Sequence, residues 1–111
     1  MAVLTHVNND VVRIKNDVDA VSAAVTLTSA DSGKWYELAA SAGVVVTLPA
    51  VESGLNFRFV VANAFDTSNY VIDSAEGDNI DGILVVNGAS VAASGEDQIN
   101  FVASAESVGD F

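Results

Sequence analysis

The sequence contains no cysteine, a single histidine, one proline and only four basic residues. Without cysteine the chain forms no disulfide and has no thiolate ligand or nucleophile, so its fold must be held by packing. A Ser-His-Asp triad would depend on His6, and a zinc site would lack its usual Cys and His ligands. We therefore expect no catalytic residue, no metal site and no cofactor in a chain that is not an enzyme.

Long apolar runs and basic clusters are also missing. Stretches such as Ala42–Leu48 are far shorter than the roughly 20 residues of a membrane-spanning helix. Asn8, Asn9 and Asp10 interrupt the region where a secretory signal would be apolar. Fifteen acidic residues give a net charge of -11, and such a surface repels the phosphates of nucleic acids. We expect neither a membrane nor a nucleic acid as a partner.

The first 25 residues carry a heptad pattern, with apolar positions spaced alternately by three and by four. The seven positions are Leu4, Val7, Val11, Ile14, Val18, Val21 and Val25. On a helix they form one stripe. Because β-branched residues fill both heptad positions, the pattern favours three or more strands and predicts a trimeric coiled coil. The alternatives are a helix packed on its own β domain and an extended arm that docks on a partner.

From Thr26 onward, short β-rich runs alternate with turn residues, a pattern typical of a small antiparallel β-sandwich or barrel. The predicted strands span 25–28, 34–39, 44–48, 56–63, 70–73, 83–86 and 98–103. Asn87 and Gly88 tolerate positive φ and predict a tight hairpin turn. We expect a mainly β chain in two parts, an oligomerisation or docking segment at 1–25 and an all-β domain at 26–111.

Side-chain alternation assigns the faces of some predicted strands. Four apolar residues share one face, namely Leu55, Phe57, Phe59 and Val61, and the two aromatic residues among them are predicted to lie in the core. The runs Val44–Val46 and Ile83–Val86 do not alternate. Both faces of these runs should therefore be covered, either by a second layer or by a neighbouring subunit.

Two further groups of residues are candidate binding sites. The oxygen-rich segment Glu76–Gly82 departs from the Ca²⁺-loop pattern, because Ile80 occupies a ligand position, and it is interpreted as a plain turn. Trp35, Tyr36 and Tyr70 are candidates for a sugar-binding face, although packing in a core or interface is the favoured interpretation. A hydrolase with two carboxylates stays the enzymatic alternative, since such a pair can come from any two strands.

Four short motifs carry a resemblance to a known class of proteins. They are LTSADSGK at 27–34, VVTLPA at 45–50, GLNFRFVV at 54–61 and GDNIDG at 77–82. Over roughly Leu27 to Gly88 the sequence resembles small structural proteins of tailed bacteriophages, especially marine and cyanobacterial ones, which serve as head decoration (cement) proteins or fibre modules. The motifs consist of turn and core residues, so they indicate fold and virion context more than a partner.

The resemblance implies a virion structural protein on the outer surface of the phage head, made in the host cytoplasm. We expect a homotrimeric decoration protein that stabilises the head, with its own copies and the major capsid protein as partners. The seven heptad residues would then serve in oligomerisation or capsid docking. The alternative is a trimeric fibre or spike module that binds a host-surface glycan.

Overall fold

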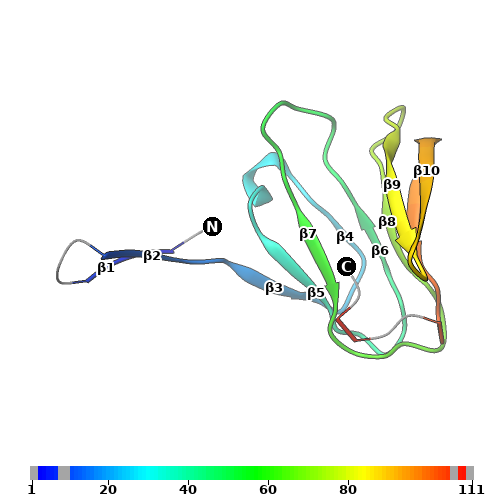
Figure 1. Ribbon diagram of the computed structural model, residues 1–111, viewed down its shortest axis with the longest axis horizontal. Helices are drawn as coiled ribbons and strands as arrows, with labels where there is room; N and C mark the ends of the chain where they lie inside the picture. The colour runs from blue at the N-terminus through cyan, green and yellow to red at the C-terminus, as the bar shows by residue number, and fades with distance from the viewer. Residues whose placement is uncertain (1–2, 8–10, 106–107, 110–111) are drawn as a thin grey trace.

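The computed structural model describes residues 3–7, 11–105 and 108–109, and it confirms a mainly β chain (Figure 1). The strands are β1 (Val3–Val7), β2 (Val11–Lys15), β3 (Val18–Val21), β4 (Val25–Thr26), β5 (Trp35–Leu38), β6 (Val45–Thr47), β7 (Arg58–Val61), β8 (Tyr70–Asp73), β9 (Ile80–Val86), β10 (Ala89–Glu96) and β11 (Gln98–Phe101). A single 3-10 turn, η1 (Ser29–Asp31), lies between β4 and β5.

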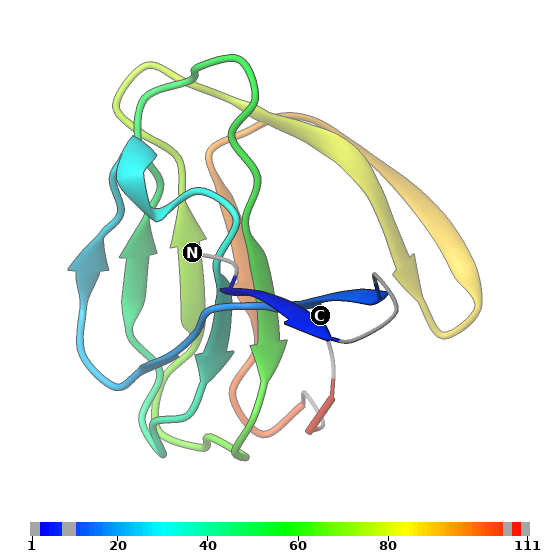
Figure 2. The same cartoon turned by 90° about the vertical axis from the view of Figure 1, so that its left-hand side faces the viewer.

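The helix predicted for residues 1–25 is not seen in the described part of the chain. β1 and β2 pair as an antiparallel hairpin that projects from the body (Figures 1 and 2), and β3 follows. β-Branched residues favour extended backbone, and a spacing of three places two strand residues on opposite faces. Accordingly Val18 is 47% exposed whereas Val21 is buried. The boundary expected after residue 25 falls within β4.

Two sheets form the body, β3-β5-β7 and β4-β6-β8-β11. From β3 to β8 the strands alternate between these sheets, so the chain winds three times around the core. Neighbouring strands from this part of the chain therefore run parallel within each sheet. The antiparallel arrangement expected from the sequence is wrong for these strands, and only the β8–β11 pair in the body is antiparallel among the described residues. Side-chain alternation is the same in both arrangements, so it does not reveal strand direction.

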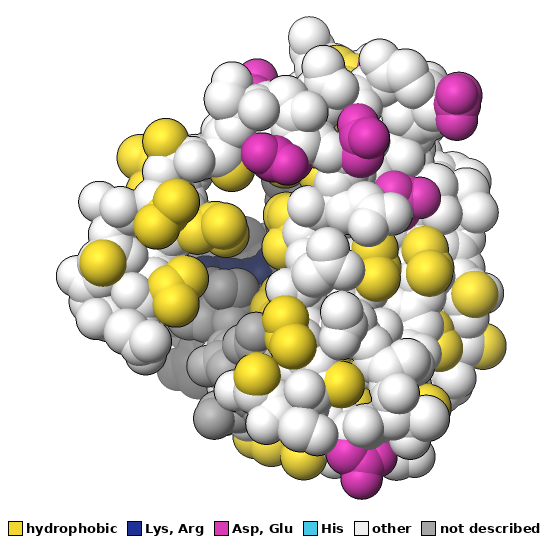
Figure 3. All heavy atoms as spheres, turned by 90° about the vertical axis from the view of Figure 1, so that its right-hand side faces the viewer, with side chains coloured by type: hydrophobic (Ala, Val, Ile, Leu, Met, Phe, Trp, Pro, Cys, Tyr) yellow, Lys and Arg dark blue, Asp and Glu magenta, His cyan; other side chains and the backbone are white. Residues whose placement is uncertain are grey.

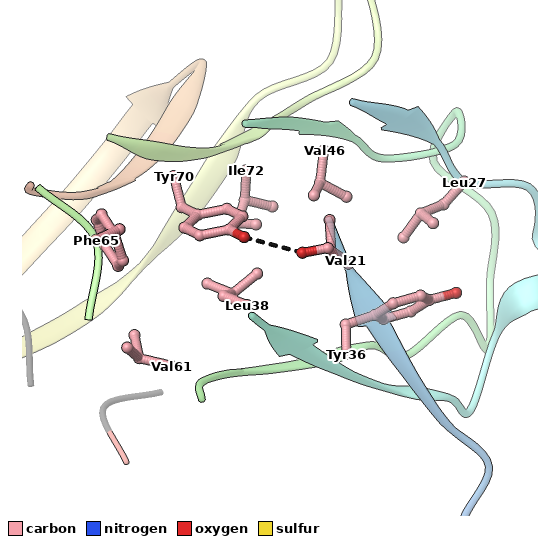
Figure 4. Packing of buried hydrophobic residues seen from close by; sticks show 9 residues of the cluster. All are labelled: Val21, Leu27, Tyr36, Leu38, Val46, Val61, Phe65, Tyr70 and Ile72. Atoms are coloured by element: carbon pink, nitrogen blue, oxygen red, sulfur yellow. Dashed lines mark hydrogen bonds between the residues drawn. The ribbon is translucent and has the colours of Figure 1, made fainter. Parts of the chain in front are cut away.

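The core lies between the two sheets (Figure 4). Its buried residues are Val21, Leu27, Tyr36, Leu38, Val46, Val61, Phe65, Tyr70 and Ile72. Phe57 and Phe59, predicted to lie in the core, pack against the cluster half-buried; on the same predicted face Val61 is fully buried, whereas Leu55 is half-buried and not part of the cluster. The rings of Tyr36 and Phe59 stack with centroids 5.5 Å apart. Apolar packing therefore joins the two sheets, as the absence of cysteine requires.

Tyr70 and Gly43 make contacts that hold separate segments of the body together. The Tyr70 hydroxyl donates to the backbone oxygen of Val21 at 2.9 Å and accepts from the backbone N–H of Ala40 at 2.6 Å. The N–H of Gly43 donates to the backbone oxygen of Ser68 at 3.1 Å. A Cβ at Gly43 would overlap the backbone of this neighbouring segment, so only glycine allows the close approach.

Candidate assembly surface

The β9–β10 hairpin stands away from the body (Figure 2). Its strands are antiparallel, with Val86 paired to Ala89 across a two-residue turn. Asn87 and Gly88 have φ values of 50° and 79°, which confirms the tight turn expected from the sequence. At the base, the Asp81 carboxylate accepts a hydrogen bond from the N–H of Gly95 at 2.6 Å. The hairpin is thus closed at both ends by local hydrogen bonding.

Large aliphatic side chains are exposed on both faces of this hairpin. Ile83 and Val85 are each 74% exposed, and the others are Leu84 at 46%, Val86 at 54% and Val91 at 52%. The non-alternating run 83–86, expected to be covered on both faces, is therefore not covered by the described part of its own chain. A contiguous exposed apolar surface of this kind is typical of protein interaction sites.

Between Asp81 and Glu96 at its base, the hairpin carries no charged side chain, although the chain is strongly acidic. No charged side chain occurs from Gly82 to Gly95, whereas Asp81 and Glu96 flank this run. The only comparable run, Leu38–Val51, supplies Leu38 and Val46 to the buried core. The uncharged run from Gly82 to Gly95, centred on the predicted turn, was the sequence signal for an exposed apolar hairpin. The turn prediction alone did not reveal the exposure of this hairpin.

A groove of about 460 Å³ separates the hairpin from the body. One wall comes from β9 and β10 with Ile83, Leu84 and Val91, and the other from β11 with Ile99 and Asn100. Figure 3 shows the hollow beside the hairpin, which lies on the left of the view and carries hydrophobic side chains. The groove therefore combines apolar walls with a polar rim near the hairpin base.

The seven heptad residues are not gathered on one stripe. Leu4 and Val7 lie on β1, and Val11 and Ile14 lie on β2, where Leu4 pairs with Ile14 and Val7 pairs with Val11. The remaining three divide between core and surface: Val21 is buried, whereas Val18 and Val25 are 47% and 37% exposed. His6 also lies on β1, opposite Val12.

The aromatic candidates for sugar binding occupy different positions. Tyr36 and Tyr70 are core residues, at 3% and 0% exposure, and burial raises the pKa of both phenols. Trp35 is half-buried, and the guanidinium of Arg58 lies 4.4 Å from its ring centroid. The three rings therefore do not form a shared sugar-stacking face.

The acidic segment 76–82 is a turn only at 76–77 and enters β9 at Ile80, and Asp78 makes its structural hydrogen bonds. The Asp78 carboxylate accepts from the N–H of Val51 at 2.9 Å, while the Ser74 hydroxyl donates to the Asp78 backbone oxygen at 2.8 Å. Among the residues that the structure describes, no three or more His, Cys, Asp or Glu side chains gather as metal ligands. Nor does the described chain contain a helix long and apolar enough to span a membrane.

Charged residues cluster around η1 instead. Lys34 Nζ lies 3.0 Å from an Asp19 oxygen and 3.2 Å from an Asp31 oxygen. The backbone N–H of Thr28 donates to the Asp31 carboxylate at 2.9 Å, and this bond together with Lys34 lowers the pKa of Asp31. The two carboxylates raise the pKa of Lys34. These ion pairs and the Thr28–Asp31 hydrogen bond stabilise the turn that precedes β5.

Comparisons with protein-family models, with curated proteins and with solved structures gave no match to this chain. Its candidate site is therefore defined by its own geometry, which places an uncharged apolar hairpin and an adjoining groove on an acidic β body.

Proposed function

We propose that this chain is a non-enzymatic virion structural protein, a homotrimeric decoration (cement) protein on the outer surface of a phage head. Its partners are its own copies and the major capsid protein, and it uses no cofactor. In this proposal the two sheets act as a small β-sandwich that carries the hairpins. The resemblance of the 27–88 segment to phage structural proteins supports the virion setting, and the exposed β9–β10 hairpin supports the assembly role.

The single observation that carries the assembly role is the exposure of five aliphatic side chains on β9 and β10. Fully burying one such side chain stabilises a protein by about 1.5–3 kcal/mol, so covering the hairpin would contribute on the order of 5 kcal/mol or more. This is comparable to the whole stability of a small domain, about 5–15 kcal/mol. Association itself costs about 4–15 kcal/mol, so covering the hairpin offsets a large part of the cost of binding a partner.

The total surface of the chain supports association with a partner. The chain exposes 7319 Å², whereas a folded monomer of 11.4 kDa exposes about 5,800 Å². Its radius of gyration is 15.6 Å, compared with about 13 Å for a compact domain of this length. The surplus of about 1,500 Å² is larger than the roughly 800 Å² that one partner buries in a standard interface, so the chain has enough extra surface for association.

The charge distribution suits a subunit on the outside of a head. The chain has a net charge of -11 and no charged side chain from Gly82 to Gly95, so its acidic remaining surface keeps the assembled protein soluble. The uncharged hairpin is the part that approaches another protein without desolvating a carboxylate. A decoration protein needs this combination, because it must bind the shell and leave the packaged nucleic acid alone.

Binding to phage heads tests this function. Purified full-length protein is added to heads that lack it, from a phage that encodes it, and in parallel to cells of the host. We expect saturable binding to the heads and an increase in their resistance to heating. Binding to host cells alone would instead favour the fibre or spike module that recognises a surface glycan. Absence of saturable binding to heads would overturn the decoration role.

A further inference from the structure

The groove between the β9–β10 hairpin and β11 needs an occupant of restricted chemistry. Its walls present Ile83, Leu84, Val91 and Ile99, so an occupant must offer apolar side chains. Glu96 also lines it and Asp81 lies at the hairpin base, so an acidic occupant would be repelled. The groove therefore favours an apolar segment that carries no carboxylates.

The hairpin of another copy of this chain has that chemistry. From Gly82 to Gly95 it carries no charge, and Val85 and Val86 lie next to its turn with more than half of each residue exposed. The turn at Asn87-Gly88 keeps this end narrow. Most other exposed segments of a second copy carry carboxylates that Glu96 would repel, whereas the segment from Gly82 to Gly95 carries none.

The backbone of the hairpin is likewise open to a second copy. Within the described chain, β9 pairs only with β10 and β10 only with β9, so the outer edge of each strand has no strand neighbour. Unpaired edges accept a further strand through main-chain hydrogen bonds. A second hairpin lying in the groove would supply both the apolar cover and the missing edge partner.

We propose that the groove between β9–β10 and β11 holds the β9–β10 hairpin of a second copy of this chain. This inference rests on the proposed function for the assembled state and adds the identity of the interface. Each subunit inserts its hairpin into the next, and in a cyclic trimer every groove is filled and every hairpin is covered. The acidic faces of the bodies remain in solvent.

The absence of cysteine allows a direct test by disulfide trapping. Val85→Cys in one full-length chain is mixed with Ile99→Cys in a second chain that carries a mass tag, and the mixture is oxidised. We expect tagged-to-untagged cross-links between these two positions. The matched control is Val51→Cys, which is 78% exposed like Val85 but lies outside the groove, mixed with Val85→Cys. This control pair should show only background cross-linking.

Oligomeric mass provides the second measurement. Light scattering of Val85→Asp should show self-association weakened by at least about 100-fold, since an unpaired charge would be buried, whereas Val51→Asp should assemble like the parent chain. Circular dichroism identifies a variant that fails to fold. In that case the cross-linking result alone decides whether the hairpin occupies the groove of a second copy. A dimer with the Val85–Ile99 cross-link would uphold the inference and overturn the trimer in the proposed function.

Two outcomes would overturn the inference. An oligomer that lacks the cross-link and tolerates Val85→Asp would place the interface elsewhere and leave the decoration role intact. A monomer at all concentrations would overturn both the inference and the homotrimer, and head binding would then be judged by its own experiment.

Discussion

The hydroxyl of Tyr70 donates a hydrogen bond to the backbone oxygen of Val21, 49 residues earlier in the chain, at 2.9 Å. Tyr70 lies in one sheet on β8 and Val21 in the other on β3, so this bond joins the two layers (Figure 4). The Ala40 N–H, which donates to the same hydroxyl, ties a third segment to this point.

Replacing Tyr70 with phenylalanine should therefore destabilise the fold. Tyr70→Phe leaves the Val21 oxygen and the Ala40 N–H without their shared partner, which should lower the free energy of unfolding by about 1–3 kcal/mol. Chemical denaturation measures this change. The control is Tyr36→Phe, because the buried Tyr36 hydroxyl has no hydrogen-bond partner in the described structure. Equal losses from both variants would contradict the role of the Tyr70 bond.

Gly43→Ala should destabilise the chain through its contact with the 68–69 backbone. The added Cβ overlaps main-chain atoms that have little freedom to move, so we expect a loss of about 1–3 kcal/mol or more in the free energy of unfolding. Gly82→Ala is the matched control, because a Cβ there meets nothing within 4 Å. Thermal unfolding compares the two variants, and tolerance of alanine at Gly43 would show that this close approach is not required.

The Asp31 carboxylate should make stability depend on pH in the acid range. Its pKa is lowered from 3.8, chiefly by the Thr28 N–H and then by Lys34, so its stabilisation is present above 3.8 and is lost as pH falls through the lower folded value. The excess stability of the parent chain over Asp31→Asn should be constant near neutral pH and should shrink as the pH falls through 3.8 and below. Urea unfolding at each pH measures it. A constant difference would show that the charge of Asp31 is not involved.

Salt should strengthen self-association if the hairpin forms the interface. Raising sodium chloride from about 0.1 M to about 1 M shortens the screening length from about 10 Å to about 3 Å, which weakens repulsion between the acidic bodies. The uncharged hairpin contact contains no ion pair to lose. Sedimentation at several salt concentrations checks this prediction. Dissociation at high salt would indicate an interface built on ion pairs.

Several features of the fold follow from local sequence. Asn and Gly adopt positive φ more readily than other residue types, so the turn at Asn87 and Gly88 was predictable from these two residues. The alternation in Leu55–Val61 likewise identified Phe57, Phe59 and Val61 as residues that pack inwards. Such signals depend on neighbours in the chain, and the sequence displays them directly.

The heptad stripe shows where a local pattern is ambiguous. The spacing that places Val18 and Val21 on one face of a helix places them on opposite faces of a strand, and the structure has the strand. Pairing of β3 with β5 decides between the two, because it supplies backbone hydrogen bonds and a core contact for Val21. That pairing depends on a segment farther along the chain, which the heptad pattern does not contain.

The sequence by itself determined that the chain is acidic, free of cysteine, mainly β and tightly turned at Asn87-Gly88. Only the tertiary structure decided that the strands from β3 to β8 alternate between two sheets with parallel pairing, and that Ile83–Val86 receives no cover from the described part of its own chain. The physical reason is that strand direction and burial arise from contacts between distant segments, whereas composition and turn geometry arise from each residue and its nearest neighbours.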